Sequence, residues 1–307
     1  MTKVLLPCIV VAASALPLPG GAHSGFDLTA FGRLPVSANG RMESFDSVAR
    51  TALVKIRGEA TTDPTMWLLE ILAKPDTADT RRVFLVKSKE LLDKLQLQAA
   101  SDGTNHYSFK DFGSKASAIN DQAKQLASVK ASDRAPWQEE LIALREKLIL
   151  YERLKNSLLP NTRLQQDAKG KPITFDFAAE LARYRTDLDE ALRVDAGRRR
   201  GSSERLAVPV EMRIRTFARL FQVVSSTGML AVVPPPRPTR SGTDWKNLGT
   251  IIVNSARGQK VPAPVTFYAG MASAFAQDKP EAFNAQVAQY REWLAANDVE
   301  ARKARLK

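Results

Sequence analysis

Apolar residues recur every three or four positions through most of this chain, which is the spacing of amphipathic helices. The stretch 43–57 is the clearest example, and its single apolar stripe comprises Phe45, Val48, Ala49, Ala52, Leu53 and Ile56. A longer stretch, 115–159, breaks near 132–136 and predicts two helices that form a hairpin or a coiled-coil-like arm. Further helices are predicted at 175–193, 245–256, 264–277 and 280–307.

Shorter segments separate these helices. Asp63 and Pro64 provide a helix cap and a first helical position, and Pro75 ends the helix that they begin. Helical spacing returns at 89–97. Strands are predicted at 83–86, 208–210 and 229–233. The predicted fold class is therefore mainly α, or α+β with a few short strands. It consists of a helical domain with a long helical hairpin, and of C-terminal helices.

The first 22 residues differ from the rest of the chain. Lys3 precedes a run at 4–22 that carries no charge and contains three prolines. Those prolines interrupt any spanning helix, which needs about 20 predominantly apolar residues. We expect residues 1–22 to be a signal peptide cut after Ala22, which places the protein on the periplasmic side of the inner membrane. An N-terminal anchor and a helix buried in the fold are the alternatives.

The remaining chain is expected to form two modules. A basic loop with two glycines at 197–203 interrupts the helical pattern. The predicted boundary separates an N-terminal helical module with the long helical arm, 23–196, from a C-terminal mainly helical module, 197–307.

Composition narrows the chemistry that the chain can perform. It has 307 residues, a formal net charge of +12, one cysteine and two histidines. An internal disulfide, a cysteine-rich metal site and a multi-histidine metal site are therefore excluded. The positive charge predicts attraction to anionic lipid or to an acidic partner. We expect no nucleic-acid partner, because basic residues are not interleaved with stacking aromatics.

Sequence motifs of catalysis are missing. The chain has no G-x-S-x-G elbow, no P-loop and no H-E-x-x-H segment, and neither histidine is placed as a general base. Neighbouring carboxylates such as Asp187 and Asp189 are interpreted as solvated charges on a helix. We therefore expect no catalytic residues and no metal site, and predict that the protein is not an enzyme.

Three consecutive arginines, Arg198, Arg199 and Arg200, are the first candidate site. They can bind phosphate groups or anionic lipid, and we interpret them as a candidate docking surface. The alternative is a solvated loop with no ligand.

A turn and the helix after it form the second candidate. Asn39 and Gly40 tolerate the positive φ that a tight turn requires. Asp46 and Arg50 stand four residues apart and can pair on one helix face, while Arg41 approaches from the turn. We expect Gly40, Arg41, Asp46 and Arg50 to form a structural clasp. An ordinary capped surface helix with one ion pair is the alternative.

The residue order of this segment resembles the start of the extracytoplasmic soluble domain of CcsA-type, system II, cytochrome c assembly proteins. The shared order is L-P-V at 34–36, G-R at 40–41, Asp46, and A-R at 49–50. Weaker similarities follow in the family's order at 67–69, 107–109, 234–236, 248–249 and 283–284. Together they extend the resemblance over 31–307.

The resemblance implies a module that supports haem delivery and attachment to apocytochrome c through a membrane-embedded assembly core. The family's tryptophan-rich haem segment is absent, so its haem site is not carried over. His106, beside Tyr107 and Phe109, is the remaining candidate haem ligand. A solvent-exposed or hydrogen-bonded histidine is the commoner arrangement. We therefore expect no resident cofactor, with haem handled by the partner.

The leading interpretation is thus the extracytoplasmic module of a cytochrome c assembly protein, with the membrane-embedded assembly core, apocytochrome c and the membrane surface as partners. The first alternative is an exported basic binding protein that docks on anionic lipid or on an acidic partner protein. The second is a cytoplasmic nucleic-acid-binding protein, which requires the N-terminal apolar run to be part of the core.

The predicted signal peptide can be checked directly. We expect the mature protein to lack residues 1–22 and to begin at His23, because the small residues before this point suit cleavage. Cell fractionation followed by N-terminal sequencing measures both the compartment and the first residue. An intact N-terminus on a cytosolic protein would contradict the expectation.

Overall fold

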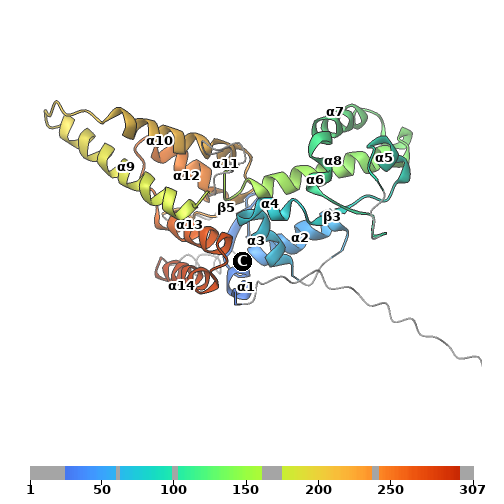
Figure 1. Ribbon diagram of the computed structural model, residues 1–307, viewed down its shortest axis with the longest axis horizontal. Coiled ribbons are helices and arrows are strands. Elements are labelled where there is room, and N and C mark those ends of the chain that lie inside the picture. The colour runs from blue at the N-terminus through green and yellow to red at the C-terminus, as the bar shows by residue number, and fades with distance from the viewer. Residues whose placement is uncertain (1–24, 60–62, 99–102, 161–174, 237–241, 298–307) are drawn as a thin grey trace, which may run out of the picture.

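The computed structural model describes residues 25–59, 63–98, 103–160, 175–236 and 242–297, and the structural statements below concern these residues. Helices dominate and the strands are few, short and antiparallel, which confirms the predicted mainly α fold class (Figure 1). Residues 1–22, the predicted signal peptide, lie outside the described residues. Within the described part of the chain, no helix combines the length and the apolar character needed to cross a membrane.

A small sheet begins the fold. β1 (Pro35–Ala38) pairs antiparallel with β2 (Arg41–Ser44) through a two-residue turn. Asn39 and Gly40 both adopt positive φ, 50° and 78°, as the tight turn of a hairpin requires. β5 (Leu230–Ala231) pairs with the other edge of β1, so the strand order is β2-β1-β5.

α2 (Phe45–Arg57) follows β2 without a loop. The Ser44 hydroxyl accepts a hydrogen bond from the Ser47 amide at 3.2 Å and caps the helix, and Gly58 ends it in a left-handed conformation. The predicted start at residue 43 is wrong, because β1 holds the chain extended as far as Ser44. The predicted apolar stripe is buried throughout.

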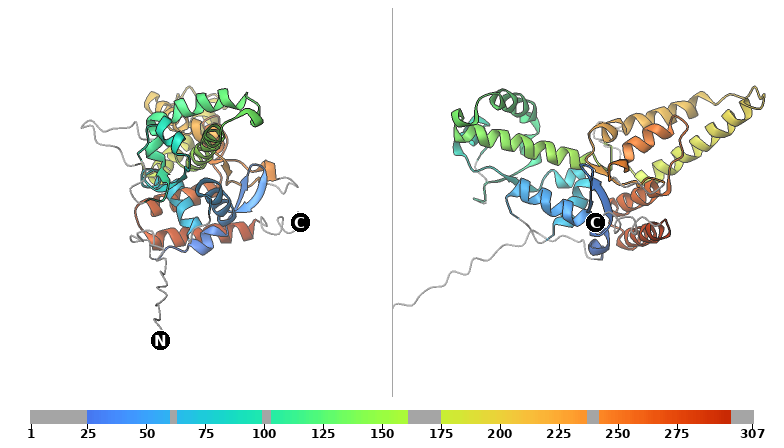
Figure 2. Two further views of the ribbon diagram at one scale, coloured as in Figure 1. Left: turned by 90° about the vertical axis from the view of Figure 1, so that its right-hand side faces the viewer. Right: turned by 180° about the vertical axis from the view of Figure 1, so that it is seen from behind.

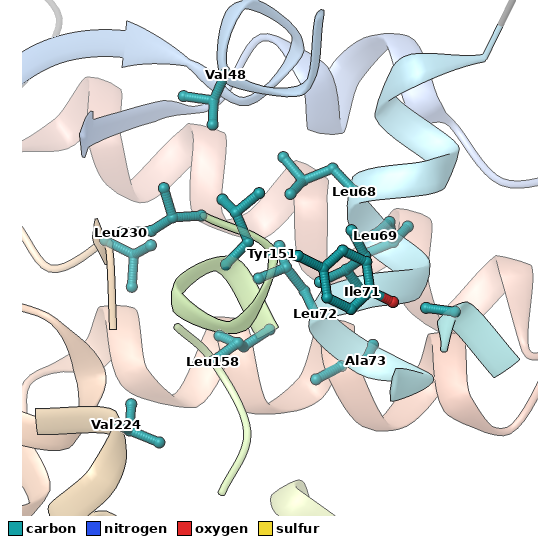
Figure 3. Packing of buried hydrophobic residues seen from close by; sticks show 14 of the residues in the cluster. Val48, Leu68, Leu69, Ile71, Leu72, Ala73, Tyr151, Leu158, Val224 and Leu230 are labelled. Atoms are coloured by element: carbon teal, nitrogen blue, oxygen red, sulfur yellow. The ribbon is translucent and has the colours of Figure 1, made fainter. Parts of the chain in front are cut away.

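α3 (Pro64–Ala73) lies at the centre of the molecule and is buried on almost every side. α2, α8 (Pro136–Lys155) and α13 (Ala263–Ala276) pack around it. Figure 3 shows the leucine and isoleucine side chains of α3 beside Tyr151 of α8. The chain then turns at the predicted proline into α4 (Pro75–Ala78).

One wing of the molecule is built on α8. β3 (Arg82–Leu85) lies where a strand is predicted and pairs antiparallel with β4 (His106–Ser108). α7 (Ala116–Ala127) packs along α8, which confirms the predicted helical hairpin. The shorter elements of this wing are α5 (Lys89–Lys94), α6 (Phe109–Phe112), η1 (Gly113–Lys115) and η2 (Ala131–Asp133).

The opposite wing contains a second helical hairpin. α9 (Phe177–Arg198) and α10 (Val208–Leu220) pack against each other and extend away from α3, and we call this unit the α9–α10 arm (Figures 1 and 2). α9 continues past residue 193, its predicted end.

The predicted strand at 208–210 is wrong, because these residues form the first turn of α10. Pro209 suits the first turn of a helix, where its missing amide hydrogen is not needed. The buried face of α10 then continues with helical spacing through Val210, Ile214 and Phe217.

A compact segment links the arm to the C-terminal helices. It contains α11 (Gln222–Thr227), η3 (Gly242–Asp244) and α12 (Leu248–Ser255). Val233 and Lys246 form an isolated antiparallel bridge. The predicted strand at 229–233 is therefore present as β5 and this bridge.

α14 (Pro280–Ala296) packs on α13 and completes the described chain. A helix is predicted here, and its buried face has helical spacing, namely Phe283, Val287, Tyr290 and Leu294. Residues 298–307 lie outside the described residues.

The two ends of the described chain meet. α1 (Leu28–Gly32) packs against α14 and α2. The Asn284 side chain donates to the Gly25 carbonyl and accepts from the Asp27 amide, each at 2.7 Å. The Phe26 ring lies 5.3 Å from that of Phe283, centroid to centroid.

The buried apolar residues form one connected cluster across the described chain. α13 contributes to it from the middle, because it contacts both α3 and α9. The division of the chain at residue 197 stays a prediction.

The close approach of α11 and α12 can be tested at Gly249. A Cβ atom at this position would lie 2.2 Å from the Ser225 nitrogen and 2.7 Å from the Phe221 oxygen. We expect Gly249→Ala to lower the free energy of unfolding by about 1–3 kcal/mol, because backbone atoms must move apart. Chemical denaturation measures this change.

Gly113→Ala is the matched control. Nothing lies within 4 Å of a Cβ atom there, and Gly113 is right-handed helical with φ −50°. This variant should be unchanged or more stable by about 0.4–1 kcal/mol. Equal unfolding midpoints for the two variants would contradict the close helix packing.

Candidate functional site

A groove of about 640 Å³ runs between α9 and α10 and is the candidate functional site. Three aromatic residues line the groove, namely Phe175 and Tyr184 on one side and Phe217 on the other. Pro209, Met212 and Leu220 add apolar side chains from α10. The groove is therefore mainly apolar, as ligand and peptide sites in proteins usually are.

The aromatic floor of the groove is rigid. The rings of Tyr184 and Phe217 stack with centroids 4.4 Å apart and planes at 28°. The Tyr184 hydroxyl lies 2.9 Å from the Ser255 hydroxyl and donates to the Ile252 carbonyl at 3.2 Å. Burial raises the pKa of Tyr184, so this phenol stays neutral and fixes the ring against α12.

The α10 side of the groove reaches the surface. Met212 is 62% exposed and Val208 is 66% exposed, although both are apolar. The two residues stand four positions apart, so they lie on the same face of α10. The buried stripe of α10 lies on its opposite face. Tertiary contacts within the described residues leave this apolar pair uncovered.

Two ion pairs lie at the rim of the groove, and one of them crosses from α9 to α10. The Asp187 carboxylate accepts hydrogen bonds from both Arg213 Nη2 at 2.6 Å and Arg213 Nε at 2.9 Å, which ties α9 to α10. Arg183 pairs with Glu180 at 2.8 Å on α9. The hydrogen bond to Asp187 raises the pKa of the Arg213 guanidinium, so it remains charged. The charged groups of the rim are thus already paired with each other.

Arginines outside the rim give the arm a positive charge. Residues 177–220 hold ten arginines and seven carboxylates, with no lysine. Within the described residues, five of these arginines have no ion pair with a carboxylate, namely Arg185, Arg198, Arg200, Arg205 and Arg219.

The structure places the predicted docking residues at the far end of the arm. Arg198 and Arg199 end or follow α9, and Arg199 pairs with Asp195 at 2.7 Å. Arg200 donates to the Ala196 carbonyl at 3.1 Å. All three arginines are exposed. Arg198 lies about 16 Å beyond Asp187 along α9, so these arginines stand outside the groove.

The predicted clasp forms only in part. Asp46 pairs with Arg50 at 2.7 Å and accepts a hydrogen bond from the Thr65 hydroxyl at 3.0 Å. Gly40 occupies the predicted turn, but Arg41 is exposed on β2. Within the described part of the chain, no ion pair joins Arg41 to Asp46. Asp46 and Arg50 also line a second, polar cavity of about 330 Å³ beside α1 and α3.

His106, the candidate haem ligand, lies on β4 at the wing built on α8. Its Nε2 atom is 3.4 Å from the Arg57 carbonyl oxygen, and its Nδ1 atom is buried without a hydrogen-bond partner. Neither cavity above is lined by His106. Haem ligation by this residue stays a prediction. Among the described residues, no group of three or more His, Cys, Asp or Glu side chains is arranged to hold a metal ion.

Sequence reasoning missed the groove. The signal was the apolar residues of α10 that fall outside its buried stripe, Val208 and Met212. Assigning 208–210 to a strand concealed it, because no helix was predicted over 208–220 and Val208 and Met212 were therefore not placed on one helix face. Asp187, expected to be a solvated charge, is in fact buried and paired across the two helices.

No family model matches the chain, and neither the curated proteins nor the solved structures provide a significant match.

The Asp46–Arg50 pair can be tested through pH. The hydrogen bond from Arg50 lowers the pKa of Asp46; burial opposes this, and the Thr65 hydrogen bond adds to it. Asp46→Asn keeps an acceptor for Thr65 but removes the charge, so we expect a small loss of stability at neutral pH, as for other exposed pairs. Thermal or chemical unfolding at several pH values measures this loss.

The direction of the pH effect follows from the lowered pKa. The charge contributes fully above the ordinary carboxyl pKa of about 3.9 and is lost as the pH falls through the lower, folded-state value. The difference between wild type and Asp46→Asn should therefore shrink below about pH 4. A difference that persists unchanged into acid would contradict a role for the charge.

Proposed function

We propose that this protein acts by binding, without a catalytic step of its own, and that the α9–α10 arm carries its binding surface. The observation that carries the proposal is the apolar groove between the two helices, open at Met212. A concave apolar site with a few polar groups is the usual form of a binding site. The charged groups at its rim hold each other in ion pairs, an arrangement that suits a fixed surface better than proton transfer.

The exposed residues of α10 support binding energetically. Fully burying an apolar side chain of this size contributes about 1.5–3 kcal/mol, and Met212 and Val208 are both more than half exposed. Single exposed apolar residues are common, but two on one helix face beside an apolar groove form a continuous patch. Methionine also adapts its shape to the surface that it meets. A partner that covers this patch gains affinity without any rearrangement of the arm.

The role in cytochrome c assembly stays a prediction. The segments that carry the resemblance, such as 34–58 and 283–284, lie outside the arm. The binding proposal therefore stands on other residues and does not depend on haem. The expected extracytoplasmic location and the expected partners, a membrane-embedded assembly core and apocytochrome c, are likewise predictions. If they are correct, the arm is the surface through which we expect this module to reach that core.

Site-specific photo-crosslinking in the cells that make the protein tests the proposal. A photoreactive amino acid in place of Met212 should give covalent adducts with another macromolecule, because the side chain lies at the open edge of the groove. The same amino acid at Val54, an apolar residue of α2 that is 45% exposed, provides a matched control away from the groove. Adducts are detected on denaturing gels and identified by mass spectrometry.

We expect adducts from position 212 to exceed those from position 54 by at least about fivefold, since contact is confined to the arm. Equal yields from the two positions, or adducts at position 54 alone, would show that the arm is not the binding surface.

A further inference from the structure

We propose that the groove of the α9–α10 arm receives a helix from a partner protein, with apolar side chains on one face and carboxylates at its flanks. This inference rests on the proposed binding function and specifies the chemistry of the occupant. Its basis is the shape of the groove, the spacing of residues along α10 and the charge of the arm.

The shape of the groove favours a helix. Two antiparallel helices leave a channel between them, and a third helix can lay its side chains into that channel. The cavity of about 640 Å³ is closed below by the Tyr184–Phe217 stack. A bilayer presents a broad surface that cannot enter such a channel, so the groove itself would remain unfilled on a membrane.

The length of the groove sets the length of the occupant. Its α10 wall extends from Pro209 to Leu220, with Met212 and Thr216 between them at intervals of three or four residues. These positions span about 16 Å along the helix, or three turns. A partner helix of three or more turns can therefore place apolar residues of spacing three and four along the whole wall.

Charge selects among helices. Arg219 lies on the outer face of α10 with Arg215, one and two turns beyond Met212, and within the described residues Arg219 has no carboxylate partner. Arg185 and Arg205 are likewise without one. Asp189 and Glu190 offset only part of this excess. An acidic helix is thus attracted to the arm, whereas a basic helix is repelled.

The same charge argues against a second copy of this chain as the occupant. Two arms brought together would each carry the excess of arginine, and like charges placed opposite each other oppose association. The net charge of +12 on the whole chain adds to that repulsion.

Peptide binding tests the inference on the full-length protein. Two fluorescent peptides of about 18 residues share one leucine face, and their flanking positions are all Glu in one and all Lys in the other. Fluorescence anisotropy should show the Glu peptide binding about tenfold or more tightly, with affinity falling as salt is added. Binding of both peptides with equal affinity, or of neither at the highest soluble concentration, would overturn the inference.

Variants locate the binding. Met212→Glu should weaken the binding of the Glu peptide about tenfold or more, because the substitution places a charge at the mouth of the apolar groove. Val54→Glu, an equal change at an exposed residue of α2, should leave its affinity unchanged. Arg219→Glu should weaken the binding of the Glu peptide and reduce the difference in affinity between the Glu and Lys peptides. Apolar contact alone does not produce this effect. An unaltered difference would contradict the role of charge.

The other occupants give different results. In one case the protein floats with phosphatidylcholine–phosphatidylserine vesicles, loses this flotation in Met212→Glu and binds neither peptide. That result would identify a membrane surface, and not a helix, as the occupant of the arm. A dimer in sedimentation equilibrium that is lost in the same variant would replace the helix by a second copy. Photo-crosslinking separates these failures from failure of the proposed function. Adducts at position 212 without peptide binding would retain the arm as the binding surface and reject only the acidic helix.

Discussion

The structure depends on covering α3. This helix is apolar on nearly all sides, so water must be excluded around its whole circumference, and no single neighbour can do this. α2, α8 and α13 share the task, although they come from three distant parts of the sequence. Its one buried acidic residue, Glu70, is matched by Arg81, whose guanidinium donates to both carboxylate oxygens at 2.7 and 3.0 Å. α8, which carries one wing, and α13, which contacts α9 of the other wing, are thus both part of the cover of α3.

The α9–α10 arm is held by specific polar contacts at its base. Asp176 accepts from the amide of Ala179 at the start of α9 and from the Ser273 hydroxyl of α13 at 2.7 Å. Tyr184 bonds to α12, and Asp187 joins α9 to α10. These contacts fix one face of the arm and leave the other face, with Met212, without internal cover. A rigid base and an uncovered apolar groove are what a binding element needs, because little order is lost when a partner arrives.

Sequence periodicity predicted the elements whose burial follows a single stripe. α2, α8 and α14 each present one buried row at three- and four-residue spacing, and each lies in a segment where the pattern predicted a helix. The errors arose where neighbours decide the structure. Residues 43 and 44 carry a helical pattern but pair with β1, and residues 208–210 carry strand propensity but begin α10. The groove could not be predicted, because it exists only when two helices meet. The partial clasp shows the same limit. Spacing on one helix predicted the Asp46–Arg50 pair, whereas the position of Arg41 depends on the path of the chain through the turn and β2.

The contact between α1 and α14 has a consequence for how the molecule matures. Phe31 and Phe26 both lie against Phe283, a residue more than 250 positions later in the chain. Phe31 can pack early on Phe45, whose ring lies 4.8 Å away, but the contact of Phe26 and Phe31 with Phe283 forms only after more than 250 further residues have been synthesised. Contacts of such sequence separation form slowly, and apolar surface that stays exposed until they form promotes aggregation. The packing of α14 on α1 is therefore a late step in the folding of the described chain, and nascent chains that stall before α14 should depend on chaperones.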